Sequence, residues 1–221
     1  MTDTKPRLTI DMVADPVCPW CYVGKRSLDR VLMAMSFSHD VVVRFRPYQL
    51  APDTPDEGVD RRSYLEKKFP DQKHRAALGK ALQDAAQGVG LDMNVEGPAR
   101  LINSLNALRV LRWAHFDGVQ LDLAEALFAS YWKQGRDISD TEELSRIAGS
   151  VGMNRQDILA RLQTAEDCDD IREEVAAFRQ GGVDGVPTFI INESLGFAGA
   201  LPPDQLLESI RKLADETTAA E

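Results

Sequence analysis

Apolar and polar residues alternate near the start of the chain, and this pattern predicts a β-strand over residues 8–14. The Asp-Pro pair at residues 15–16 ends the strand, because a residue before proline avoids the helical backbone region. Apolar residues then recur at helical spacing, which predicts a helix with Cys18 at its N-terminal end. A β-branched run over residues 41–45, closed by a proline, predicts a second strand.

Helical periodicity dominates the middle of the chain. A loop rich in proline and acidic residues opens this part at residues 51–58. Ser139 and Glu142 have the spacing of a capping box ahead of one helix. Asn154 is placed to cap the next helix, and Gly181 is placed to end a third. We therefore expect a block of helices between two strand-forming ends.

Strand character returns at residues 188–191, and another short strand is expected near Phe197 after an intervening turn. A pair of prolines at residues 202–203 opens a last amphipathic helix. The complete order is βαβ, a block of helices, and ββα. This order predicts an α/β protein in which a sheet is interrupted by a long helical insertion.

The same order divides the chain into two predicted domains. Residues 1–50 and 185–221 are expected to form one discontinuous domain that contains the sheet. Residues 51–184 are expected to form a large inserted all-helical domain. The insertion is expected to close over Cys18; the basis for this division is the strand character of both ends of the chain and its absence between them.

Composition and charge disfavour two classes of partner. The chain of 221 residues is 43% hydrophobic and 28% charged, and its formal net charge is −9. Nucleic acids and anionic membranes both select basic faces, so neither is expected to bind this chain. No apolar stretch reaches the roughly 18 residues that a membrane span needs.

A secretory signal is not expected either. The first apolar stretch is broken by Asp11 and closed by Asp15, whereas a signal peptide needs about 7–15 apolar residues. We therefore expect a cytoplasmic location, where thiols are kept reduced. In that setting the three cysteines of the chain are expected to be catalytic or metal-binding rather than structural.

Cys18-Pro19-Trp20-Cys21 is the strongest chemical signal in the sequence. A helix N-terminus stabilises a thiolate, so Cys18 is predicted to be an acidic, exposed nucleophile. Cys21 lies one turn further into the helix and is predicted to be the resolving thiol of a reversible disulfide. Trp20 has two interpretations: it presents an apolar surface to the substrate, or it packs on the helical block.

Half of a zinc site is the competing interpretation of this motif. Zinc needs four ligands, and Cys168 with the three histidines of the chain provides no second closely spaced pair. Without that pair no metal is expected, although a zinc or interaction module without catalytic activity stays open as an alternative. Four carboxylates stand near Cys168 and disfavour a thiolate there, so Cys168 is expected to be a poor nucleophile.

Val186-Pro187 is a second signal, because a proline directly before a strand cannot donate to the sheet. A trans bond is the ordinary case, since only about 5–6% of X–Pro bonds in folded proteins are cis. The CxxC motif after strand one, the Gly-Val-Pro-Thr segment and the closing ββα unit together resemble a thioredoxin fold. The helical insertion makes the chain similar to the DsbA family, and most similar to its FrnE-type cytoplasmic oxidoreductases, near the 2-hydroxychromene-2-carboxylate isomerases.

The resemblance covers most of the chain and implies roles for several residues. In this fold the proline that matches Pro187 is cis and lies against the active-site disulfide. Val186 and Pro187 are thereby implied to contact substrate, together with Pro19 and Trp20. Four segments carry the resemblance, at residues 15–24, 46–50, 137–140 and 197–200.

The resemblance implies a thiol–disulfide oxidoreductase, acting as a protein disulfide oxidoreductase or disulfide isomerase. Its partners would be protein or small-molecule thiols and disulfides, attacked by Cys18 and released through Cys21. No organic cofactor is expected, and glutathione is a candidate co-substrate. The isomerase and kappa-class glutathione transferase relatives have serine where Cys18 stands. A glutathione-dependent isomerase or transferase is therefore the alternative function.

A local basic cluster stands out in this acidic chain. It could receive an anionic tripeptide thiol or an acidic partner, but a run of charge is more commonly a solvated helix face. The cluster consists of Arg61, Arg62, Lys67, Lys68, Lys73 and Arg75.

Overall fold

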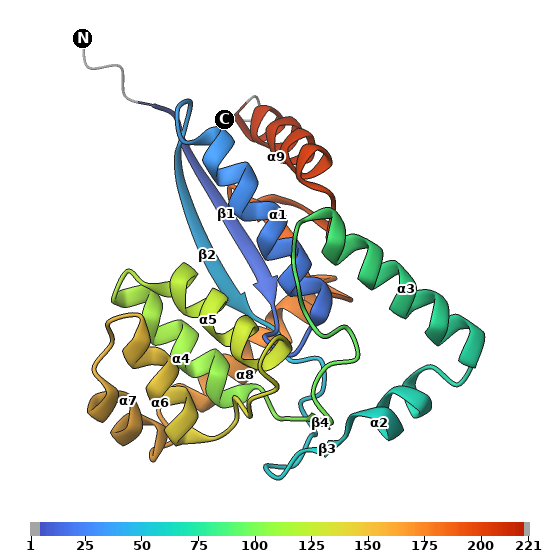
Figure 1. Ribbon diagram of the computed structural model, residues 1–221. Helices are drawn as coiled ribbons and strands as arrows, with labels where there is room; N and C mark the ends of the chain where they lie inside the picture. The colour runs from blue at the N-terminus through green and yellow to red at the C-terminus, as the bar shows by residue number, and fades with distance from the viewer. Residues whose placement is uncertain (1–4, 219–221) are drawn as a thin grey trace.

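The structure is a computed structural model that describes residues 5–218 of the chain. The outermost residues of the predicted sheet domain, 1–4 and 219–221, lie outside the described residues. Figure 1 shows a sheet built from both ends of the chain, with the middle of the chain forming helices around it. Within the described range, no helix is both long and apolar enough to cross a lipid bilayer.

Four strands from the two ends of the chain form one mixed sheet, in the order β2-β1-β5-β6. The strands are β1 (Arg7–Ala14), β2 (Asp40–Pro47), β5 (Thr188–Ile191) and β6 (Leu195–Ala198). β1 pairs in parallel with β2 and antiparallel with β5, and β5 pairs antiparallel with β6. The predicted strands are confirmed, and their ends differ from the predicted ends by at most two residues.

Helices occupy the chain between these strands. The sheet is accompanied by α1 (Pro19–Met35) and α9 (Pro203–Thr218). The segment between β2 and β5 forms α2 (Arg61–Lys68), α3 (Gln72–Gly88), α4 (Leu105–Phe116), α5 (Gln120–Trp132), α6 (Thr141–Ser150), α7 (Arg155–Leu162) and α8 (Cys168–Gln180). It also contains a two-residue antiparallel pair that the sequence did not predict, β3 (Val59–Asp60) with β4 (Arg100–Leu101). The predicted α/β order is confirmed, whereas the domain limits stay a prediction.

The two faces of the sheet are covered by different helices. Met12 of β1 faces α1, because its methyl group lies 3.5 Å from the position of a β-carbon built on Gly24. Asp11 points to the opposite face, since side chains alternate along a strand. On that face Arg46 of β2 pairs with Glu174 of α8, with Nε 2.5 Å from Oε1. α9 packs beside α1 (Figure 1), so these two helices cover one face of the sheet and α8 lies against the other.

Two side chains of α5 attach the helical segment to the sheet. The Gln120 amide donates to the Phe45 carbonyl at 3.1 Å and accepts from the Phe45 N–H at 2.8 Å, so it pairs with the edge of β2 as a strand would. Trp132 Nε1 donates to the Pro16 carbonyl at 3.0 Å, directly beside the CxxC motif. These contacts fix the helices relative to the start of α1.

The predicted helix ends are confirmed in two cases and wrong in one. Asn154 caps α7 by accepting from the N–H groups of the first turn, and Gly181 ends α8. The capping box at Ser139 is wrong, because Asp140 is the N-cap of α6 and accepts from the Glu142 N–H at 2.9 Å. Ser139 instead donates to Asp137, which draws it out of the capping position.

Candidate active site

The N-terminal end of α1 places Cys18 at the turn between β1 and the helix. Cys18 is the N-cap residue, in an extended conformation with φ −90° and ψ 117°, and Pro19 follows in the first turn. Proline suits this position because the first helical N–H groups have no partner within the helix. The Cys18 N–H donates to the Asp15 carbonyl at 2.9 Å, which closes the turn after β1. Both Cys18 and Cys21 are free thiols.

Val186-Pro187 lies directly against this end of α1. The bond is cis, as predicted, and the Cys18 thiol donates to the Val186 carbonyl at 3.5 Å. Pro187 packs on Gly24, where a β-carbon would come within 2.9 Å of the proline Cγ. Only a residue without a side chain allows this approach. The structure therefore brings together residues that are far apart in the sequence.

The two thiols are both buried, which corrects one prediction. Cys18 is only 3% exposed, so the expectation of an exposed nucleophile is wrong: the turn after β1 and the Val186 carbonyl enclose it. Cys21 is 0% exposed. Burial raises the pKa of Cys21 well above its ordinary value, and the hydrogen bond and charge of Cys18 raise it further. Cys21 is thus held as a protonated thiol beside Cys18.

Pro19 and Trp20 are half-buried at the start of α1. Trp20 packs against the hydrophobic core while part of its surface stays accessible, so both interpretations of this residue fit its position. Cys168 begins α8 and is also half-buried. Among residues 5–218, no three His, Cys, Asp or Glu side chains gather closely enough to hold a metal ion.

Asp15 is a site residue that the sequence did not single out. Its side chain is completely buried, and its carboxylate accepts from the Leu50 N–H at 2.7 Å and the Val17 N–H at 3.1 Å. Burial raises the pKa of Asp15 to about 6, against the opposing effects of these hydrogen bonds, of Ser104 and of the charge on Lys68. The available signal was an acidic residue between a buried strand and the CxxC motif.

A charged cluster lies one turn beyond Cys21, between α1 and α5. Lys25 is buried and forms ion pairs of 3.0 Å with Asp29 and with Glu125. The Tyr22 hydroxyl donates to Glu125 at 2.8 Å, and Arg26 lies 3.9 Å from the same carboxylate. Tyr22 also stacks on Phe128 of α5, with ring centroids 5.0 Å apart. This cluster ties the CxxC helix to the helical segment.

Known proteins share this architecture. A probable DsbA oxidoreductase from Streptomyces coelicolor is 25% identical, with a TM-score of 0.82 over 93% of this chain and 89% of that one. A 2-hydroxychromene-2-carboxylate isomerase is 18% identical, with a TM-score of 0.71 over 96% and 99%. The cytosolic disulfide reductase DsbM from Pseudomonas aeruginosa, also solved with GSH, is 16% identical, with a TM-score of 0.63 over 96% and 98%.

A family model matches the sequence as well as the fold. The model describes a DSBA-like thioredoxin domain and matches residues 9–211, from β1 into α9. The match includes the CxxC motif, the helical segment and the cis-proline loop, so the resemblance predicted from these motifs is confirmed. The chain therefore belongs to the DSBA-like thioredoxin domain family, whose members are thiol oxidoreductases and isomerases.

Proposed function

We propose that the protein is a thiol–disulfide oxidoreductase that uses Cys18 as its nucleophile and Cys21 as its resolving thiol. The observation that carries the proposal is the placement of both thiols in the first turn of α1, with the Val186 carbonyl 3.5 Å from Cys18 Sγ. The helix dipole favours negative charge at the position of Cys18. Cys21, whose raised pKa keeps its proton, is suited to act second.

The reaction proceeds by two thiol–disulfide exchanges. The Cys18 thiolate attacks one sulfur of a substrate disulfide, and that bond breaks with release of a substrate thiolate, which takes up a proton. Cys21 then loses its proton and attacks the Cys18 sulfur of the mixed disulfide. The second substrate thiol leaves, so the substrate is reduced and the Cys18–Cys21 pair is oxidised. The same steps in reverse oxidise a dithiol substrate.

Substrate contacts are assigned to the residues around Cys18. Val186 and Pro187 are assigned to contact the substrate on one side of Cys18, and Pro19 with the accessible part of Trp20 on the other. Because Cys18 is 3% exposed, substrate binding has to displace part of this enclosure before attack. Glutathione is the proposed small-molecule co-substrate, supported by a fold neighbour that was solved with GSH. No organic cofactor is proposed, and the cytoplasmic location stays a prediction.

The roles of the two cysteines are tested by replacing each one. Cys21→Ser removes only the resolving thiol, so it is expected to accumulate mixed disulfides through Cys18 with glutathione or protein under mild oxidation. Cys18→Ser is expected to accumulate few. Cys168→Ser is the matched control and should behave like the wild type. Trapped species are counted by intact-protein mass spectrometry after acid quenching.

Two results would contradict the proposal. The first is a Cys21→Ser variant without mixed disulfide together with a Cys18→Ser variant that retains full exchange activity. The second is glutathione-dependent isomerase turnover that survives in Cys21→Ser, since isomerisation needs no resolving thiol. That second result would establish the alternative function for this chain.

A further inference from the structure

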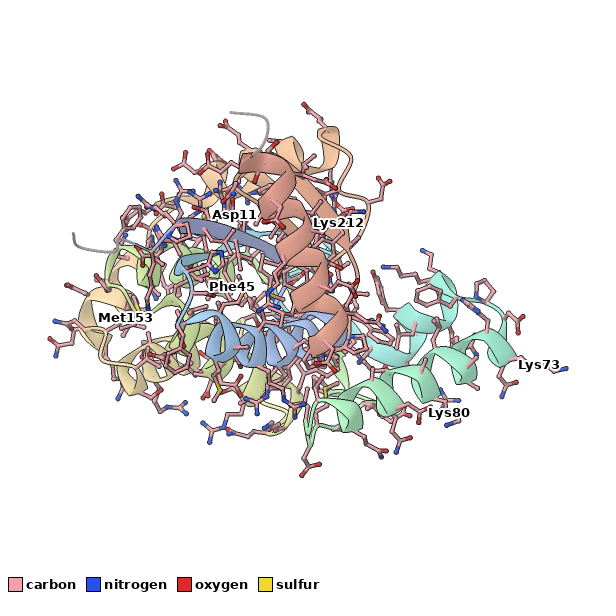
Figure 2. The ribbon with its side chains drawn as sticks, turned by 90° about the horizontal axis from the view of Figure 1, so that it is seen from above. Asp11, Phe45, Lys73, Lys80, Met153 and Lys212 are labelled. Atoms are coloured by element: carbon pink, nitrogen blue, oxygen red, sulfur yellow. The ribbon has the colours of Figure 1, made fainter. Side chains whose placement is uncertain are left out.

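Helices α2 and α3 form an arm that extends from the body of the molecule, as Figures 1 and 2 show. We call residues 61–88 the basic arm. It carries seven basic and three acidic residues, a formal charge of +4. The remainder of the chain has 19 basic and 32 acidic residues, a formal charge of −13. The molecule is therefore strongly polarised between the arm and everything else.

Part of the arm's positive charge is already used within the fold. Arg61 is buried, donates to the Glu96 carbonyl at 3.1 Å and lies over the Trp132 ring at 4.7 Å. Arg62 and Lys80 each pair with a carboxylate one turn further along their own helix. These three cations stabilise the arm itself and leave little charge for a partner.

Three lysines are not neutralised in this way. Lys67, Lys68 and Lys73 are exposed, on both sides of the turn between α2 and α3, and within residues 5–218 none of them forms an ion pair with a carboxylate. The nearest acidic residue of the turn, Asp71, is occupied as the N-cap of α3. Lys68 Nζ lies 3.4 Å from the Tyr64 hydroxyl and stands over that ring, so it is ordered without a counter-charge.

The N-terminal end of the arm lies beside the CxxC motif. Arg61 stands over the ring of Trp132, and Trp132 Nε1 donates to the Pro16 carbonyl, two residues before Cys18. The other end of the arm is held further along α1, where Arg30 donates to the Val89 carbonyl at 2.9 Å. Lys68 is near enough to Asp15 for its charge to lower the pKa of that buried carboxyl. The Asp15 carbonyl in turn accepts from the Cys18 N–H. A ligand held along the lysines would thus reach toward Cys18.

We propose that the basic arm is a docking surface for acidic polypeptides, and that it selects them as the disulfide substrates of Cys18. This inference rests on the function proposed above and names its substrate class. The rest of the chain carries a net negative charge that disfavours an acidic polypeptide, so the arm is the part of the molecule that attracts one. Lys67 and Lys68 lie in the last turn of α2 and Lys73 in the first turn of α3, so the unpaired charges are spread over two helices, which suits the repeated carboxylates of an acidic polypeptide better than a tripeptide.

The test uses two peptides of equal length that contain the same internal disulfide, flanked by glutamates in one and by lysines in the other. The pre-reduced protein reduces each peptide in a single turnover, and the second-order rate constants are compared. At low ionic strength the acidic peptide is expected to react about tenfold faster. The ratio should fall toward one as salt is added, because screening removes the attraction.

A charge variant assigns the preference to the arm. The triple variant Lys67→Gln, Lys68→Gln, Lys73→Gln is expected to lose most of the rate ratio. A control that removes three exposed cations elsewhere, Arg155→Gln, Arg172→Gln and Lys212→Gln, should keep it. Using the ratio cancels any general change in thiol reactivity between the variants.

Three outcomes separate the failure of this inference from the failure of the proposed function. Equal wild-type rates for both peptides at low salt would overturn the docking surface while the oxidoreductase stands. A preference that persists at its wild-type size in the arm variant would also overturn it, whatever the result in the control. If neither the peptides nor a small neutral disulfide such as hydroxyethyl disulfide is reduced, the proposed function itself fails.

Discussion

Two carboxyl groups beside the first turns of α1 have pKa values that are shifted in opposite directions. Asp15 is completely buried, makes no ion pair within the described residues, and has a pKa raised to about 6 by that burial. Burial also acts to raise the pKa of Glu125, but the charge and hydrogen bond of Lys25 with the Tyr22 hydroxyl outweigh it, so its pKa is lowered. The two sites differ in both depth and partner, because Asp15 is 0% exposed without an ion pair among the described residues, whereas the Glu125 side chain is 31% exposed and pairs with Lys25.

These opposite pKa shifts distinguish the CxxC end of α1 from the charged cluster around Lys25, one turn further along the helix. At the CxxC end, burial raises the pKa values of Asp15 and Cys21, so both groups hold their protons to a higher pH than they would in water. One turn further, the cluster around Lys25 keeps its charges and ties α1 to α5. The first turn of α1 therefore carries the two thiols in a site where burial disfavours charge. The next turn carries the ion pairs that attach α1 to α5.

The largest expected effect comes from removing the titrating group of Asp15. Its folded-state pKa of about 6 lies above the ordinary value of 3.8, so its protonation favours the folded state. That contribution is fully present below about pH 4 and is lost as the pH rises through 6, about 3 kcal/mol of unfolding free energy. Relative to the wild type, Asp15→Asn should become more stable by that amount between pH 4 and 7, measured by urea unfolding of the reduced protein.

Asp53→Asn is the control, because it removes one negative charge from an exposed residue of the loop after β2. Its stability difference from the wild type should show no comparable rise over the same range. Parallel curves for the wild type and Asp15→Asn would mean that the Asp15 carboxyl is solvated in solution, and the contrast with Glu125 would disappear.

A smaller effect is expected from breaking the charged cluster. Lys25→Met leaves Asp29 and Glu125 facing each other with only Arg26 nearby, at 3.7 and 3.9 Å. Loss of one partner from a buried pair costs about 3–5 kcal/mol, and these carboxylates are about one-third exposed, so we expect about 2 kcal/mol at pH 7. The loss of unfolding free energy is measured by urea unfolding of the variant and the wild type.

The pH dependence of that loss has the opposite sign to that of Asp15. Because the pKa of Glu125 is lowered, its pairing stabilises the fold above the ordinary value of 4.5 and is lost on acidification. The cost of Lys25→Met should therefore shrink as the pH falls below about 4. The double variant Lys25→Met/Glu125→Gln should cost less than the sum of the single changes. An additive result would show that the pair is not coupled.

Local patterns were sufficient for most of the fold. Strand β1 and helix α1 could be predicted because their apolar periodicity and the proline that separates them are local features of the sequence. The Ser139 cap failed by one position, since Asp140 is an equally good cap and local sequence does not rank them. The β3–β4 pair was missed because two residues carry no periodicity and their partners lie 42 and 40 positions away, in the pairs Val59↔Leu101 and Asp60↔Arg100.

The candidate site also has features that the sequence predicts and features that it does not. CxxC at a helix start is a local signal, and the position of Pro187 followed from a family resemblance that links distant segments. The burial of Cys18 and Asp15 could not be predicted, because it depends on Val186 and Leu50 meeting the turn after β1. From the sequence alone, Asp15 beside Pro16 indicates only the end of a strand. Its role as a buried acceptor becomes visible only when the N–H groups of Val17 and Leu50 are placed around it.

The smallest effect tests whether the basic arm lies beside the active site when no substrate is bound. The charge of Lys68 lowers the pKa of Asp15, so Lys68→Met should raise it, by less than about one pH unit because the lysine is exposed and its charge is screened. The Asp15 carboxyl can be followed by carbon-13 NMR between pH 4 and 8. Lys73→Met, at the far end of the arm in Figure 2, is the matched control and should leave that titration in place. An unchanged Asp15 titration in Lys68→Met would show that the arm swings away from Cys18 in solution, and peptides bound along it would then not be directed to the thiol.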